Sequence, residues 1–177
     1  MVLYKVTDED GRSCSGGTGQ WAVPDGEAPG AWMPMIADIM PCARGYHLCR
    51  EGDLIAWLGP VVWEAEVAPG AEVVEADDKI VVSSARLVRR LETWTDRTAR
   101  LFAADCAEHV LPLFARECPD DMRPREAIAA ARAYVRGEIG AATGDAAWAA
   151  AGAAERAWQT ARLLAYAREE VSRDGGR

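Results

Sequence analysis

The residues best suited to chemistry are cysteines and a histidine in the first half of the chain. Cys42, His47 and Cys49 form a C-x4-H-x-C cluster, and Cys14 could supply a fourth ligand across a sheet. Thiolates and imidazole are the ligands that tetrahedral zinc prefers. The spacing is not one of the strong zinc patterns, and free cysteines are commonly small core residues. A zinc site and a group of packed thiols beside a hydrogen-bonded histidine are therefore both open interpretations.

Aromatic side chains give the same region a second interpretation. Tyr46 precedes His47, and Trp57 and Trp63 follow in the same half of the chain. Such a set is suited to stacking a planar ligand such as a nicotinamide or an adenine. Aromatic residues also fill cores, and a pocket needs convergent polar groups before it is preferred to packing. Tyr46, His47, Trp57 and Trp63 are the candidate ligand-binding residues, with core packing as the alternative.

The second half of the chain carries charged residues at helical spacing. Asp105 and His109 lie four residues apart and share a helix face with apolar neighbours. One interpretation is an interhelical network of buried ion pairs that fixes the helix register. The other is a groove for an anionic or peptide ligand, because arginine and tryptophan are common interface anchors. The candidates for these roles are Asp105, His109, Arg123, Arg125, Glu155, Trp158 and Gln159.

Two kinds of structure must position these residues. In the first half, short β-branched runs predict strands over 3–6, 61–67, 79–82 and 86–91, with a short helix after Asp53. From Thr93 onward alanine dominates, and helices are predicted over about 95–117, 124–139 and 145–172. The sequence therefore predicts the α+β class. A small, mostly antiparallel β domain with a short helix spans 1–91, and an all-α three-helix bundle spans 93–173.

Composition and charge exclude several classes of function. The chain has 177 residues, half of them apolar, so it can bury a real core. Its formal charge of −8 argues against binding nucleic acid through the phosphates. The most apolar stretch, 139–154, is mostly alanine and too weakly hydrophobic to span a membrane. The N-terminus shows no secretory signal, so we expect a cytosolic protein, in which the five cysteines are thiols or metal ligands.

Motifs for nucleotide hydrolysis and for serine catalysis are not recognisable in the sequence. The glycine-rich run Ser15-Gly16-Gly17-Thr18-Gly19 lacks the lysine of a P-loop and is not followed by a helical pattern. Ser13 and Ser15 are not part of a nucleophile-elbow string. ATP chemistry and Ser-His-Asp catalysis are therefore not expected.

Each half of the chain resembles a known family. The first half resembles an uncharacterised domain that recurs in bacteriophage and bacterial proteins, at Leu3-Tyr4-Lys5-Val6, Cys14, Cys42, Gly45-Tyr46-His47-Leu48-Cys49, Glu64-Ala65-Glu66-Val67 and Asp78-Lys79-Ile80. The second half is similar to a helical immunity-protein domain of polymorphic toxin systems, at 104–111, 123–128 and 155–159. The second resemblance implies a protein that binds and neutralises a partner.

A fainter similarity links the first half to small ADP-ribosyltransferases. It rests on the order of a strand, a Gly-x-His motif, a short helix and the two strands that contain 66–70 and 79–82. Lys5 stands where those enzymes commonly carry a histidine or an arginine, and Asp77 or Asp78 stands where a glutamate would be expected. The similarity implies an NAD-binding enzyme or its inactive descendant.

The sequence thus leads to two expectations about function. The first is a non-catalytic, inhibitor- or immunity-like binding protein of phage or prophage type, which binds a protein or a small ligand. The second is an ADP-ribosyltransferase-like protein with Tyr46 and His47 in a nicotinamide pocket. No cofactor is expected apart from the zinc alternative, and neither nucleic acid nor a membrane is an expected partner.

Overall fold

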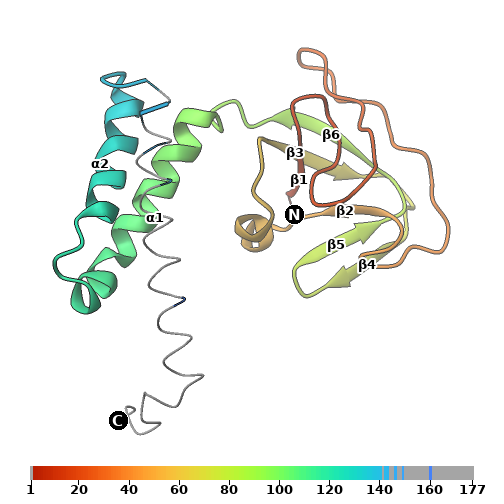
Figure 1. Ribbon diagram of the computed structural model, residues 1–177. Coiled ribbons are helices and arrows are strands. Elements are labelled where there is room, and N and C mark those ends of the chain that lie inside the picture. The colour runs from red at the N-terminus through yellow and green to blue at the C-terminus, as the bar shows by residue number, and fades with distance from the viewer. Residues whose placement is uncertain (1, 141, 144–145, 147–148, 150–159, 161–177) are drawn as a thin grey trace, which may run out of the picture. The chain divides into compact units, whose positions relative to one another are not determined.

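The computed structural model describes residues 2–140, 142–143, 146, 149 and 160. The chain divides into two compact units, Met1–Asp96 and Arg97–Arg177, which we describe separately. The elements of the described residues are β1 (Leu3–Thr7), β2 (Tyr46–Leu48), η1 (Glu51–Trp57), β3 (Val61–Val67), β4 (Val73–Ala76), β5 (Lys79–Val82), β6 (Ala85–Arg90), α1 (Asp96–Glu117) and α2 (Arg123–Arg136) (Figure 1). η1 is a short 3-10 helix and the others are strands and α-helices.

The first sheet of the N-terminal unit has the strand order β1-β3-β6, with both pairings antiparallel. Its central strand shows the alternation that the sequence predicts: Trp63 and Ala65 are buried, whereas Glu66 is exposed. On the outer face, Arg86 Nη2 lies 2.7 Å from a Glu66 carboxylate oxygen. Opposite charges across neighbouring strands stabilise such a pairing modestly.

The second sheet has the strand order β2-β5-β4, also antiparallel (Figure 1). All four residues of β5 are buried, as expected of a central strand. A turn at the acidic residues Asp77 and Asp78 joins β4 to β5, directly before the strand that the sequence predicts over 79–82. β2 and β4 were not predicted as strands, because β2 has only three residues and β4 is a half-exposed edge strand containing Glu75.

One core joins the two sheets. Its buried cluster combines Trp63 and Leu87 from the first sheet with Leu48, Ile80 and Val82 from the second. The backbones also connect directly, because Tyr4 and Cys49 exchange two N–H···O hydrogen bonds of 2.9 and 2.8 Å. β1 is therefore fixed against both sheets, and this connection places its next residue, Lys5, beside the end of β2.

The described part of the helical unit is a close pair of helices. α1 and α2 pack through Ala104, Ile128 and Ala131, and small residues allow helices to approach closely. α2 has Pro124 in its first turn and ends at Gly137, whose positive φ of 80° forms a left-handed cap. Antiparallel sheets and α-helices together confirm the α+β class. The predicted third helix, 145–172, lies outside the described residues apart from isolated positions.

Candidate functional site

The N-terminal unit contains a cavity of about 510 Å³. Most of its wall comes from two segments, the loop 13–19 and the segment 42–49 that leads into and through β2. The remaining lining residues are Lys5, Val6, Trp21, Ile36, Trp57 and Lys79. The cavity therefore gathers residues of β1, β2, η1 and β5, and its volume lies in the range of about 300–1,000 Å³ typical of small-ligand pockets.

Lysine is rare in this chain and is concentrated at the cavity. The sequence contains only two lysines, Lys5 and Lys79, against eighteen arginines. Both lysines line the cavity, and each is only 8% exposed. A lysine has a compact charge on a flexible stem and is rarely buried without a partner. This placement was not foreseen, although the scarcity of lysine in the sequence was a usable signal.

Lys5 is held without a carboxylate. Its Nζ donates a hydrogen bond of 3.2 Å to the carbonyl oxygen of His47 and lies 5.2 Å from the centre of the Trp21 ring. Among the described residues, no acidic side chain forms an ion pair with it. Burial lowers the pKa of the Lys5 ammonium group. The cost of burying the positive charge is thus only partly offset.

Lys79 differs from Lys5 because it has an acidic partner. Its Nζ lies 2.9 Å from a carboxylate oxygen of Asp78 and 4.5 Å from the centre of the Trp57 ring. The hydrogen bond with Asp78 raises the pKa of Lys79. The charge of Lys79 is thus balanced by a neighbouring carboxylate, whereas no described acidic side chain balances that of Lys5.

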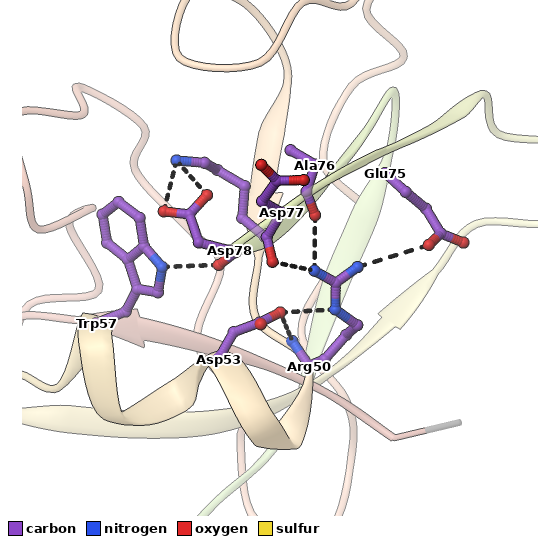
Figure 2. A network of polar contacts seen from close by, with 8 residues as sticks. Arg50, Asp53, Trp57, Glu75, Ala76, Asp77 and Asp78 are labelled. Atoms are coloured by element: carbon purple, nitrogen blue, oxygen red, sulfur yellow. Dashed lines mark hydrogen bonds and ion pairs between the residues drawn. The ribbon is translucent and has the colours of Figure 1, made fainter.

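A polar network on Arg50 fixes the part of the wall that carries Trp57 and Lys79 (Figure 2). Arg50 Nη2 donates hydrogen bonds of 2.6 and 3.0 Å to the carbonyl oxygens of Ala76 and Asp77, and its Nε lies 2.7 Å from Asp53. Trp57 Nε1 donates to the carbonyl oxygen of Asp78 at 2.9 Å. These contacts join η1 to the β4–β5 turn. The Arg50–Asp53 contacts also cap the N-terminus of η1. Asp53 is the third residue of this helix, whereas we expected the helix to begin after it.

Tyr46 and Trp21 form the aromatic part of the cavity. Their rings meet edge to face with centroids 5.4 Å apart, a favourable arrangement for aromatic pairs. The Tyr46 hydroxyl donates a hydrogen bond of 2.9 Å to the carbonyl oxygen of Pro34. Tyr46, His47 and Trp57, three of the four candidate ligand-binding residues, therefore line one cavity. Trp63 does not, since its ring is buried in the core and donates to Thr7 Oγ1 at 2.8 Å.

The His47 ring organises the loop before β2. Its Nε2 accepts a 3.0 Å hydrogen bond from the backbone N–H of Cys42, and its Nδ1 lies 3.1 Å from the carbonyl oxygen of Gly45. These partners fit the neutral imidazole with the proton on Nδ1. Burial, followed by the charge of Lys5, lowers the pKa of His47. Both ring nitrogens are thus engaged with the backbone.

The three cysteines of the predicted zinc set occupy different environments. Cys49 is buried, Cys14 is partly buried and Cys42 is exposed. Burial raises the pKa of the Cys49 thiol to about 11 and also raises that of Cys14. In the part of the chain that the structure describes, no group of three or more histidine, cysteine or acidic side chains is arranged to hold a metal ion. The zinc interpretation stays a prediction, for which metal analysis is the test.

One candidate residue of the helical unit, Asp105, takes part in an exposed polar contact between α1 and α2. Arg132 Nη2 on α2 lies 2.9 Å from Asp105 Oδ1 and 2.5 Å from Glu108 Oε2 on α1. Both acidic side chains are 58% exposed, so this contact is not the buried ion-pair network that we expected. The reason is that Ala104 and Ala107, rather than Asp105, face the neighbouring helix.

The other candidates that the structure describes are not part of that contact. His109 is exposed, Arg123 pairs with Asp121, and Arg125 lies near the sulfur of Met122 at 3.8 Å. Glu155, Trp158 and Gln159 lie outside the described residues. No helix in the described part of the chain is long and apolar enough to cross a membrane.

Comparison with known proteins identifies a relationship for the helical half. Residues 89–169 match the family described as "Imm-5 like putative immunity protein". This part of the chain, which includes α1 and α2, is therefore similar to an immunity-protein family, as the sequence predicted. No curated protein and no solved structure matches the chain. The resemblance of the first half to an uncharacterised phage and bacterial domain stays a prediction.

Proposed function

We propose that this chain is an inhibitor- or immunity-like binding protein, whose helical part binds a protein partner of the toxin class. The match of residues 89–169 to an immunity-protein family carries the proposal. We further propose a phage or prophage origin and a cytoplasmic location, which rest on the sequence alone.

The surface of α1 supports a protein partner. Val110 and Leu113 are 51% and 58% exposed, and their spacing of three places them on one side of the helix. Ala104 and Leu111, by contrast, belong to or pack against the small core shared with α2. Exposed apolar side chains beside a polar contact are common at protein interfaces. We therefore place part of the partner surface at Val110 and Leu113.

A capture and reconstitution experiment tests the proposal. The full chain is used as bait in lysate of its host, captured proteins are identified by mass spectrometry, and the best candidate is purified and titrated by calorimetry. We expect a stoichiometric complex and neutralisation of the partner's toxicity on co-expression. Absence of a complex with every purified candidate would contradict the proposal.

Two matched variants locate the surface. Leu113→Asp places a charge on α1, and Ile55→Asp places one on η1 at a side chain that is 61% exposed. We expect Leu113→Asp to weaken binding about tenfold or more, as at interface hot spots, and Ile55→Asp to leave it unchanged. The reverse result would place the surface on the N-terminal unit.

The cavity favours a second candidate function, an ADP-ribosyltransferase-like NAD-binding protein or its inactive descendant. It brings Tyr46, His47 and Trp57 together, as a nicotinamide pocket would require. The inactive form is better supported, because no carboxylate lines the cavity within the described residues and Asp78 pairs with Lys79. NAD binding or glycohydrolysis that is lost in His47→Ala would support this candidate, and no NAD binding by the unaltered protein would exclude it.

A further inference from the structure

The charge of the cavity is a property that the proposed inhibitor- or immunity-like function does not require. Its charged lining residues are Lys5, Arg44 and Lys79, all of them cationic, whereas the whole chain carries a formal charge of −8. We propose that the cavity binds a small molecule in which a compact anionic group, a phosphate or a carboxylate, is attached to a planar body, and that Lys5 holds the anion.

The unbalanced charge of Lys5 is the first argument. An ammonium group has three donors, and Lys5 uses one of them in its hydrogen bond to the His47 carbonyl oxygen. Lys5 lies within β1, opposite Trp63 of β3. This strand pairing fixes the backbone of Lys5, so the residue cannot shift to expose its ammonium group to bulk water. An anion entering the cavity would supply the missing acceptor. Charge-assisted hydrogen bonds are stronger than neutral ones, more so where water is excluded.

Lys79 is the internal comparison for this argument. Asp78 already neutralises it, and the Trp57 ring covers it. The third cation, Arg44, is exposed and lies at the rim. An incoming anion would therefore gain most from Lys5, while Lys79 and Arg44 would add long-range attraction.

The planar body follows from the rest of the lining. Trp21 and Tyr46 form an edge-to-face pair next to Lys5, and Trp57 stands beside Lys79. The loop 15–19, which also lines the cavity, contains only glycine, serine and threonine, so a ligand could approach its backbone closely. Aromatic faces and edges bind planar rings well, and the volume is in the range of small-ligand pockets.

Matched pairs of probes test the proposal on the full chain. AMP is compared with adenosine, and nicotinate with nicotinamide, so that each pair shares a planar ring and differs in the anion. Inorganic phosphate tests the anion alone, and NAD tests the second candidate function. We expect the anionic member of at least one pair to bind about tenfold more tightly than its neutral partner in calorimetry. Equal binding within both pairs, or no binding of either anionic probe at millimolar concentration, would overturn the proposal.

Lys5→Met separates a ligand-binding lysine from a structural one. Methionine fills a similar volume without the charge, so we expect the variant to melt at the same or a higher temperature in the absence of ligand. It should also lose the preference for the anionic probe. Arg86→Gln is the control, because it removes a cation of the same unit that stacks on Trp32 outside the cavity. A Lys5→Met protein that keeps the full preference would overturn the proposal.

A spectroscopic readout keeps the test independent of how Lys5→Met folds. With only two lysines in the sequence, selective ¹³C-lysine labelling yields two side-chain signals, which Lys79→Arg assigns. AMP should shift the Lys5 signal more than the Lys79 signal, and adenosine should shift neither comparably. A larger response at Lys79 would contradict the role of Lys5. AMP and nicotinate are tested separately from NAD and from the protein partner. Either proposed function can therefore fail while anion binding by the cavity is confirmed, and anion binding can fail while either proposed function is confirmed.

Discussion

The two units of this protein use their polar residues differently. The N-terminal unit has exposed ion pairs but also directs several polar groups inward: Trp63 donates to Thr7 inside the core, and both ring nitrogens of His47 contact backbone groups. In the helical unit, Arg132 contacts Asp105 and Glu108, whose side chains are exposed to solvent. Directed internal contacts fix the shape of a cavity, whereas exposed charges and apolar side chains suit recognition of another surface.

The hydrophobic cores show the same contrast. Ten buried residues form the cluster of the N-terminal unit, and three form the described cluster of the helical unit. Alanine supplies two of those three, so little apolar surface is buried per helix turn. The difference indicates that core packing contributes most of the stability of the N-terminal unit. The following experiments test that comparison.

The largest effect on stability is expected from a large-to-small substitution in the core of the N-terminal unit. Leu87 is fully buried on β6, and Leu87→Ala should lower the free energy of unfolding of the N-terminal unit by about 3 kcal/mol through lost burial and a residual cavity. Leu113→Ala, at an exposed position, should change the stability by less than about 0.5 kcal/mol. Urea denaturation measures both. Similar losses for the two variants would remove the distinction between core and surface leucines.

A smaller but still large effect is expected at Gly45. Its φ is +120°, and an added Cβ would lie 2.6 Å from Val81 Cγ1. Gly45→Ala should therefore cost roughly 2 kcal/mol through strain and overpacking. Gly52→Ala is the control, since nothing lies within 4 Å of its added Cβ. If the two variants melt alike, the loop before β2 is not held as tightly as the contacts indicate.

Acid should weaken the N-terminal unit through His47. Burial lowers the pKa of His47 in the folded state, so the unfolded chain binds this proton more tightly. This contribution is absent above the ordinary histidine pKa of about 6.5 and destabilises the fold as the pH falls below it. His47→Gln should flatten the slope of stability against pH in that window. A slope that stays as steep in His47→Gln as in the unaltered protein would place the titration elsewhere.

The smallest effect is expected at the exposed polar contact of the helical unit. Arg132→Ala removes an arginine whose two acidic partners are mostly solvated, and such pairs contribute little to stability. Its melting temperature should match that of the unaltered protein within replicate error. A clear drop would show that this contact stabilises the α1–α2 pair.

Local patterns predicted much of the fold. The alternation in β3, the acidic turn at Asp77 and Asp78, and Pro124 at the start of α2 are each specified by nearby residues. β2 escaped prediction because three residues are too few to show a period, and its pairing with β5 depends on residues more than thirty positions away. The α+β class can be predicted from the change in composition along the chain, whereas the register between paired strands cannot.

The candidate site was predicted only in part. Tyr46, His47 and Trp57 do lie together, but we did not predict from the sequence that Lys5 and Lys79 share their cavity. Strand pairing at Tyr4–Cys49 and in β5 brings these lysines to the same wall. The sequence overestimates the burial of Asp105. The spacing of Asp105 and His109 places them on one helix face but does not tell which face packs against α2, and Ala104 occupies that face.

One calorimetric titration tests most directly whether the helical part carries partner binding. The purified partner is titrated against the unaltered chain, Leu113→Asp and Lys5→Met. Our account predicts that Leu113→Asp loses most of the affinity while Lys5→Met retains it, because the proposed partner surface lies on α1 and the cavity is formed by the N-terminal unit. Loss of affinity in Lys5→Met with full affinity in Leu113→Asp would contradict that account.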